Sequence, residues 1–328
     1  MHAALWILAF LVVLWAAGPR PRRLRLGGRL PELPKDAAAA ASWLDAKEAA
    51  RPVRPDNQAR VVWAGEPGRA TDWCFVYLHG FSASWREGSP VHLNSARRYG
   101  ANLLLPRLSG HGLVVEDPLI DLDARALWED SKEALALAHA LGKRVLLMAT
   151  SSGAPLALHL AALFPEQVDA LVFYSANIRI RQPGSRLMTW PWGLYVARLV
   201  KGGKYNSWSE GEEASRYWYG RQRLEGAVQL QALLDATTKA RDLARVTQPL
   251  YAGVYYRDEK HRDPTIEVDG VRWMIHTVGT PAVHKRLQEF PDATNHVIAC
   301  DLMNCDWRAV QAGTWAFLEE VVGLKALP

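Results

Sequence analysis

Short runs of consecutive apolar residues, separated by longer amphipathic stretches, set the pattern of this chain. The runs are Trp73–Leu78, Ala101–Leu105, Arg144–Ala149, Asp169–Tyr174 and Leu250–Tyr256. Apolar residues that follow one another without alternation are typical of strands in a parallel sheet covered on both faces. The stretches between them predict helices, including Leu122–Leu141, which Gly142 should end, and Trp307–Val322. We therefore expect an α/β protein with a doubly wound, mostly parallel sheet.

The spacing of these runs also predicts the domain organisation. The connection from Tyr174 to Leu250 is far longer than an ordinary crossover and is rich in tryptophan and tyrosine. We expect residues 176–246 to be an inserted cap, and residues 60–175 and 247–328 to form the core domain around it. Residues 19–59 are basic and rich in proline and alanine, with only a short helical stretch near Ser42–Ala50, which predicts a tether.

The N-terminal segment, residues 1–18, contains no charged side chain. As a helix it would be about 27 Å long, which is near the minimum for crossing a bilayer. We expect a single-pass membrane anchor, with the membrane as a partner. The arginines that follow it, between Arg20 and Arg25, favour a cytoplasmic position for the main body. The alternative is a signal peptide with an atypical start, followed by export after cleavage.

Composition and charge narrow the possible functions. The chain is 49% hydrophobic and 22% charged, which is typical of a folded globular protein. Its net charge of +5 lies entirely within residues 1–35, so the rest of the chain is neutral. A neutral body argues against nucleic acid as a partner. Three cysteines are too few for a disulfide framework, and no zinc-finger spacing accompanies them, so neither disulfides nor a structural metal is expected.

A candidate nucleophile follows one of the buried runs. Ser151 comes directly after Arg144–Ala149 and before an apolar helical stretch, with Ala149 and Gly153 two positions away on either side. A serine on a sharp strand-to-helix turn requires small residues at those two positions. Ser152 fits less well because Thr150 would occupy the first of them. The competing interpretation of Ser151 is an ordinary N-cap serine.

A second turn can supply hydrogen-bond donors to a substrate. The run Trp73–Leu78 leads into His79 and Gly80, where the glycine allows the backbone to turn and expose its amide groups. The N–H of Phe81 and the N–H of Ser152 are therefore candidate donors to one carbonyl oxygen, as an oxyanion hole. A plain strand-to-loop turn is the competing interpretation.

A nucleophilic serine requires a base, and His296 is the preferred candidate among ten histidines. It lies in a turn-rich loop between the expected last strand, Lys285–Phe290, and the final helix, so it can reach the carboxyl edge of the sheet. His111 is the main competitor, but it precedes the serine in the chain.

The acid that orients the base should follow the run Leu250–Tyr256. Asp258 is the preferred residue because it is nearest the end of the expected strand, with Glu259 and Asp263 as the other candidates. A charged turn of this kind can also be merely solvated.

With Ser151, Asp258 and His296 in this order, and the His-Gly turn before them, the chain resembles the α/β-hydrolase superfamily. It looks most like the lysophospholipase or monoacylglycerol-lipase branch, over roughly residues 60–324. The resemblance implies a nucleophile, an acid, a base and an oxyanion hole at the residues named above, acyl transfer in two steps, and no metal or organic cofactor. Two features depart from the family pattern. Ala149 replaces the commoner glycine, and the cap carries no recognisable substrate motif.

The function predicted from these residues is a membrane-anchored serine hydrolase of small carboxylic esters, with lipid-derived acyl esters as one candidate class. Two alternatives remain open. The same residues could cleave amides, or the fold could be an inactive scaffold that acts as a binding module. The sequence indicates no oligomeric state.

Overall fold

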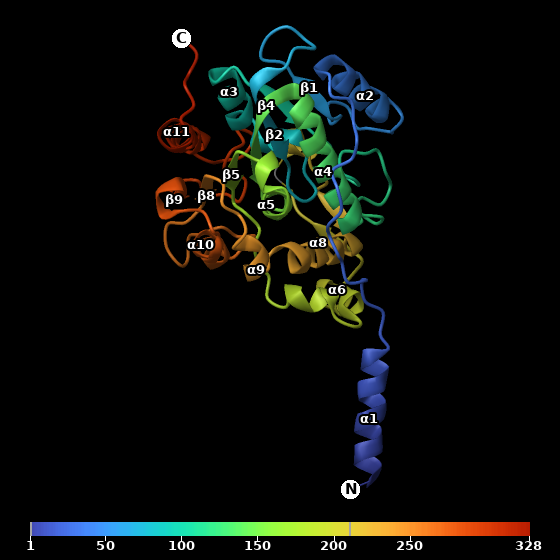
Figure 1. Cartoon of the computed structure of the whole chain (residues 1–328). Coiled ribbons are helices and arrows are strands. Elements are labelled where there is room, and N and C mark those ends of the chain that lie inside the picture. Colours follow the sequence, from blue (N-terminus) through green and yellow to red (C-terminus); the bar gives the residue numbers. More distant parts are fainter. Residues whose placement is uncertain (1, 210) are drawn as a thin grey trace.

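A central parallel sheet organises the computed structural model, which describes residues 2–209 and 211–328 (Figure 1). Within these residues seven strands form the sheet in the order β1-β3-β2-β4-β5-β8-β9, and all neighbours are parallel except the antiparallel pair β1 and β3. Their bounds are β1 Arg60–Val62, β2 Thr71–Leu78, β3 Asn102–Leu105, β4 Gly142–Thr150, β5 Ala170–Tyr174, β8 Leu250–Val254 and β9 Lys285–Glu289. The prediction of a doubly wound, mostly parallel sheet is confirmed.

Helices cover both faces of this sheet, which explains why its strands are apolar at consecutive positions. In β4, Val145 and Leu147 belong to one buried cluster, whereas Leu146 and Met148 belong to the other. The first cluster includes residues of α2, α4, α5 and α10, and the second includes residues of α3 and α11. These helices are α2 Ala37–Ala49, α3 Val91–Arg98, α4 Ala124–Leu141, α5 Gly153–Leu163, α10 Val268–Thr277 and α11 Trp307–Phe317, the last continued by a π-helical turn, Leu318–Val322.

The long connection between β5 and β8 forms a layer of short elements beside α4 and α5. Its elements are α6 Gly193–Lys201, β6 Tyr205–Ser207, α7 Glu212–Ser215, β7 Arg221–Arg223, α8 Leu224–Thr237 and α9 Ala240–Leu243. The strands β6 and β7 pair in an antiparallel ribbon, and α8 packs against α4, α5 and α6. This is the segment predicted to be the cap.

Much of the predicted tether, residues 19–59, is packed against the folded domain. Four leucines of the extended stretch, Leu24, Leu26, Leu30 and Leu33, contact the first buried cluster. The Trp128 indole N–H donates to the Gly27 carbonyl at 2.9 Å. Much of the segment therefore packs on the domain where the sequence predicted a tether. Four scattered leucines are partly buried and Ala37 and Ala40 are buried, although no strand or long helix pattern predicts this packing.

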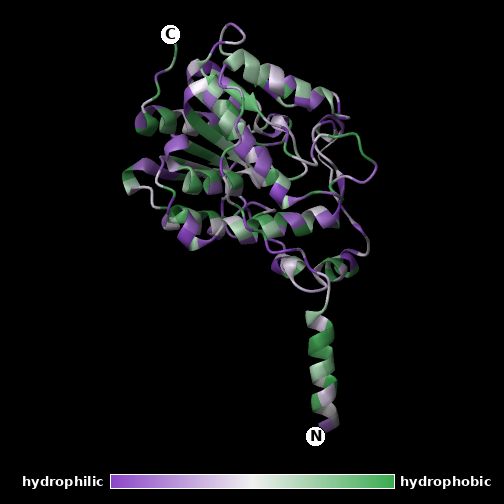
Figure 2. Cartoon of the chain, turned by 45° about the vertical axis from the view of Figure 1, so that its right-hand side comes forward, coloured by the Kyte–Doolittle hydropathy of each residue, from purple (hydrophilic) through white to green (hydrophobic). Residues whose placement is uncertain are grey.

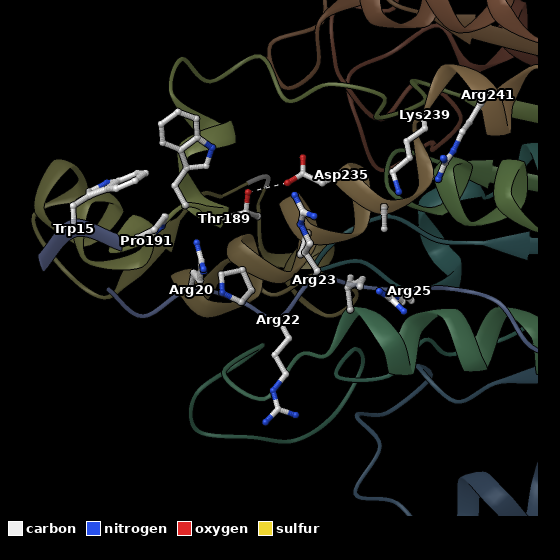
Figure 3. A pocket seen from close by; sticks show the side chains of 15 residues that line it. Trp15, Arg20, Arg22, Arg23, Arg25, Thr189, Pro191, Asp235, Lys239 and Arg241 are labelled. Carbon is white, nitrogen blue, oxygen red and sulfur yellow. Dashed lines mark hydrogen bonds between the residues drawn. The ribbon is translucent and has the colours of Figure 1, made fainter. Parts of the chain in front are cut away.

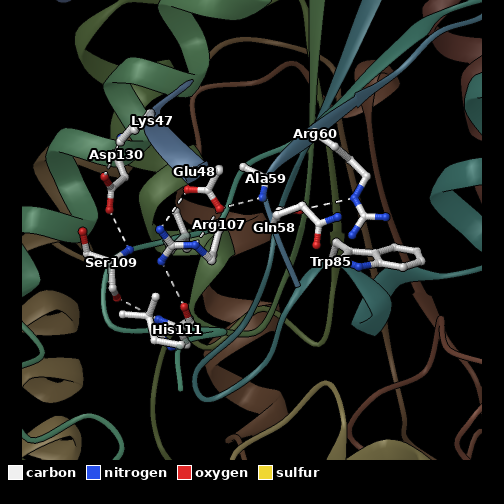
Figure 4. A network of polar contacts seen from close by, with 12 residues as sticks. Lys47, Glu48, Gln58, Ala59, Arg60, Trp85, Arg107, Ser109, His111 and Asp130 are labelled. Atoms are coloured by element: carbon white, nitrogen blue, oxygen red, sulfur yellow. Dashed lines mark hydrogen bonds and ion pairs between the residues drawn. The ribbon is translucent and has the colours of Figure 1, made fainter. Parts of the chain in front are cut away.

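The helix α2 is fixed to the domain by a buried ion pair (Figure 4). Glu48 accepts two hydrogen bonds from the Arg107 guanidinium, at 2.7 and 2.8 Å, and one from the Ala59 N–H at 2.9 Å. Both charged side chains are more than nine-tenths buried. Arg107 in turn donates to the His111 carbonyl at 3.1 Å. The pair thus connects α2 to the loop after β3.

The first helix, α1 His2–Ala16, extends away from the domain (Figure 1) and is mostly apolar along its length (Figure 2). At about 1.5 Å per residue it is about 22 Å long, whereas the hydrocarbon core of a bilayer is about 30 Å thick. In residues 2–209 and 211–328, no helix combines the length and apolar character needed to cross a membrane. The prediction of a spanning helix in residues 1–18 is therefore not supported, because the helix ends at Ala16, before Gly18 and Pro19.

Candidate active site

Ser151 lies on a sharp turn between β4 and α5, as its flanking small residues predict. Its backbone has a φ of +51°, a left-handed conformation that is uncommon for residues other than glycine. The turn is held by the Ser151 N–H, which donates to the Tyr174 carbonyl at 3.0 Å. A Cβ at Gly153 would lie 2.1 Å from the Leu78 carbonyl oxygen, so only glycine fits there. Strain of this kind is typical of functional turns.

His296 and Asp263 form a buried pair. The Nδ1 of His296 lies 2.8 and 3.0 Å from the two carboxylate oxygens of Asp263. Asp263 is completely buried, and the His296 side chain is 13% exposed. Burial alone would lower the pKa of His296, but the charge of Asp263, its hydrogen bond and the charge of Glu87 together raise that pKa. Because Nδ1 faces the carboxylate, Nε2 is left to act on another group.

Asp258, the predicted acid, does not contact His296 in the structure, which places Asp263 there instead. Asp258 is exposed and binds the ring Nδ1 of His261 at 2.9 Å, which lowers the pKa of Asp258 to about 2. The sheet strand β8 ends at Val254, and the chain then forms a short hairpin in which Tyr256 pairs with Arg262. Asp258 lies at the exposed tip of this hairpin. The returning arm carries Asp263, one of the other two candidates, to His296.

The carboxylate of Asp263 also organises the turn that follows it. It accepts the N–H groups of Thr265 at 2.8 Å and Ile266 at 3.1 Å. Its own N–H donates to the Tyr255 carbonyl at 3.0 Å. These bonds fix the carboxylate opposite the histidine. The third candidate, Glu259, is exposed and pairs with Arg262.

The two expected oxyanion donors both have free backbone N–H groups. In the part of the chain that the structure describes, neither the Phe81 N–H nor the Ser152 N–H has a hydrogen-bond acceptor. The turn before Phe81 is fixed by His79, whose Nε2 accepts the Leu108 N–H at 3.1 Å and whose Nδ1 lies 2.9 Å from the Gly80 carbonyl. Burial keeps the pKa of His79 well below its usual range, so its ring is neutral.

Comparison with known proteins identifies the family. The sequence model described as "Alpha/beta hydrolase family" matches residues 75–303, which is more than half of the chain. The chain belongs to the alpha/beta hydrolase family. A comparison with curated protein sequences found no match.

Solved structures share the fold of this alpha/beta hydrolase at low sequence identity. One belongs to a study of LipS and LipT, two metagenome-derived lipolytic enzymes. It is 17% identical with a TM-score of 0.66, and the match covers 81% of this chain and 99% of the other. The monoacylglycerol lipase of Paleococcus ferrophilus is 13% identical with a TM-score of 0.55, covering 79% and 98%. Est1E of Butyrivibrio proteoclasticus, solved with ferulic acid, is 12% identical with a TM-score of 0.55, covering 81% and 95%.

Glu87, a residue that the sequence analysis missed, lies beside the turn at Gly80, close to Ser151, in this alpha/beta hydrolase. Its carboxylate accepts the Gly80 N–H at 2.5 Å and the Tyr77 hydroxyl at 3.2 Å. A Cβ on Gly80 would lie 2.7 Å from a Glu87 oxygen and 3.0 Å from the Ser151 Cβ. Burial raises the pKa of Glu87 to about 7, although the Gly80 N–H and the charge of His296 oppose the rise. Glu87 therefore brings a second carboxylate close to both Ser151 and His296.

The competing base, His111, has a structural position in this hydrolase. Its ring packs edge-on against the ring of His79, with centroids 4.9 Å apart, and its Nδ1 lies 2.9 Å from the Ser109 carbonyl. Burial lowers the pKa of His111 to about 4. Within residues 2–209 and 211–328 His111 contacts no carboxylate, so the geometry favours His296 as the base.

Proposed function

We propose that this protein is a serine hydrolase that cleaves carboxylic esters through Ser151, His296 and Asp263. The observation that carries the proposal is the buried pair of His296 and Asp263 together with the strained turn at Ser151. A base held by a carboxylate and a serine on a strand-to-helix turn are the parts that acyl transfer requires. Ser151 Oγ has no hydrogen-bond partner among the described residues, and such contacts are often loose until substrate binds.

The proposed reaction has two steps. In the first, Nε2 of His296 takes the proton of Ser151 as the hydroxyl oxygen attacks the ester carbonyl carbon. The N–H groups of Phe81 and Ser152 hold the negative oxygen, and the alcohol leaves with the proton from His296. In the second, His296 takes a proton from water, and the hydroxide attacks the acyl group on Ser151. The carboxylic acid then leaves, and the proton returns to Ser151. Asp263 fixes the ring tautomer and stabilises the protonated imidazole throughout.

Acyl esters with an apolar chain are the substrate class that we propose. Two of the solved structures that share the fold are described as a lipolytic enzyme and a monoacylglycerol lipase. Fold alone does not fix the substrate, so the neighbours support the choice only in general terms. A panel of acyl p-nitrophenyl esters of increasing chain length and of aminoacyl amides would separate esters from amides. Faster cleavage of the amides would contradict this choice.

A fluorophosphonate probe tests the nucleophile directly. We expect the probe to label the wild-type protein and to spare Ser151→Ala, because only an activated serine attacks the phosphorus atom. The matched control is Ser207→Ala, at an exposed position in strand β6, which should be labelled like the wild type. Absence of labelling in folded wild-type protein would contradict the proposal and would favour a binding module on a hydrolase scaffold.

A further inference from the structure

An extended apolar surface lies at the end of the molecule from which α1 projects. It consists of the exposed apolar side chains of α1 together with Trp190, Tyr195, Leu199 and Val200 of the cap, and we call it the α1–α6 surface. Trp6 is 76% exposed, Leu199 83% and Val200 73%. Isolated apolar residues are common on protein surfaces, but many large exposed apolar residues gathered at one end of a molecule mark an interaction site.

The helix α1 is attached to the cap by specific contacts. The backbone N–H of Trp192 donates to the Pro19 carbonyl at 2.9 Å, and the indole N–H of Trp192 donates to the Leu14 carbonyl at 3.2 Å. The rings of Trp15 and Trp190 pack edge-on, with centroids 6.2 Å apart. Trp192 itself has a φ of +65°, an unusual conformation for a bulky side chain. Helix and cap therefore present their apolar side chains as one unit.

A basic groove of about 1210 Å³ lies beside this surface (Figure 3). Its lining extends from Arg20, next to α1, to Arg241 of the cap. The basic side chains in the lining are Arg20, Arg22, Arg23, Arg25, Lys239 and Arg241. Within the described residues, the four arginines of residues 20–25 form no ion pair. The one carboxylate in the lining, Asp235, accepts the Thr189 hydroxyl at 2.8 Å.

We propose that the α1–α6 surface docks on a membrane that contains anionic phospholipids, and that the arginines of the groove bind the lipid phosphates. Residues 3–17 carry no polar side chain, so α1 is apolar on every side. Acyl chains can cover every side of a helix, whereas a protein groove would leave part of it in water. Arginine pairs with phosphate through two parallel hydrogen bonds, and tryptophan is enriched where acyl chains meet head groups.

Binding of this kind does not require a helix that spans the bilayer, and it does not depend on the proposed hydrolysis. The apolar residues enter the acyl chains of one leaflet without crossing the bilayer, and the arginines next to Pro19 lie where the head groups begin. Each arginine near an anionic surface contributes about 1 kcal/mol of binding free energy, which corresponds to roughly a fivefold change in affinity. We therefore expect binding to anionic vesicles to weaken as salt is raised.

Vesicle flotation of the full chain tests the proposal. The vesicles contain phosphatidylcholine alone or phosphatidylcholine with phosphatidylglycerol. We expect the wild type to float with both and to bind the anionic vesicles more tightly. Changing Arg20, Arg22, Arg23 and Arg25 to Gln should weaken binding to the anionic vesicles by roughly several hundredfold, about fivefold for each arginine, and leave binding to phosphatidylcholine unchanged. The matched control removes the same charge from exposed positions outside the groove, at Arg51, Arg69, Arg97 and Arg308.

A second pair of variants tests the apolar part of the surface. Leu199→Ser with Val200→Ser should weaken binding to both kinds of vesicle, because it removes apolar contact from α6. The control is Val114→Ser with Val115→Ser, which changes two exposed valines elsewhere. Equal effects of a test variant and its control would overturn the proposal. So would a wild type that self-associates in buffer and does not float, since a second copy would then cover the surface. Flotation does not depend on activity, so it fails or succeeds independently of the proposed hydrolysis.

Discussion

Asp258 and Asp263 lie on one short hairpin, and their surroundings differ completely. Asp263 is buried against His296, whereas Asp258 is exposed against His261. We expect Asp263→Asn to lower kcat for an ester by about 10³- to 10⁴-fold, because the amide favours the wrong imidazole tautomer. Asp258→Asn should stay within about twofold of the wild type, since surface ion pairs contribute little. Steady-state kinetics on a soluble ester, with circular dichroism to confirm folding, measure both.

Equal losses in these two variants would contradict the assignment of Asp263. The asparagine at 263 keeps one oxygen to accept the N–H groups of Thr265 and Ile266, so the turn should persist. A loss of activity together with a loss of the near-ultraviolet spectrum would instead indicate a structural role.

Glu87 should control the pH dependence of the reaction. His296 must be neutral to accept a proton, so kcat/KM should rise with pH through its raised pKa. Glu87 helps to raise that pKa through its charge, and Glu87 itself loses its proton at about pH 7. Glu87→Gln removes this charge and should move the midpoint of the profile to lower pH. The control is Glu213→Gln, at an exposed position on α7. A midpoint that stays in place or rises would contradict this role.

At the scale of elements, the sequence predicts those strands and helices whose burial leaves a long apolar pattern along the chain. The strands and the helices α4 and α11 were predictable because their apolar patterns continue over many residues. The helix α2 lies mostly within an alanine-rich stretch, and only contacts such as that of Leu44 with the core reveal its place. Short alanine side chains carry almost no apolar pattern, so the sequence predicted only the stretch near Ser42–Ala50 as helical and did not show that this helix packs on the core.

The choice of the carboxylate that faces His296 shows a second limit of prediction from sequence. The apolar run Leu250–Tyr256 continues two residues beyond the strand, which ends at Val254. The hairpin that follows depends on hydrogen bonds between backbone groups, such as the Arg257 N–H to the His261 carbonyl at 2.8 Å. No side-chain pattern announces such a turn. The position of Ser151 on its turn and of His296 in its loop could be predicted from the local turn and from topology, whereas the choice among Asp258, Glu259 and Asp263 as the partner of His296 required the hairpin.

At the scale of the whole molecule, the N-terminal segment has two parts with different roles in stability. Residues 1–18 contain α1, most of whose described side chains are exposed, whereas residues 19–35 place four leucines against the buried core and supply carbonyl acceptors to Trp128 and Lys132. Deleting residues 1–18 should change the free energy of unfolding by no more than about 1 kcal/mol. Deleting residues 1–35 should lower it by about 3–5 kcal/mol, since four partly buried leucines are lost. Urea unfolding followed by far-ultraviolet circular dichroism measures both. Equal midpoints for the two deletions would mean that the extended segment does not hold the basic groove and α1 in a fixed position on the domain.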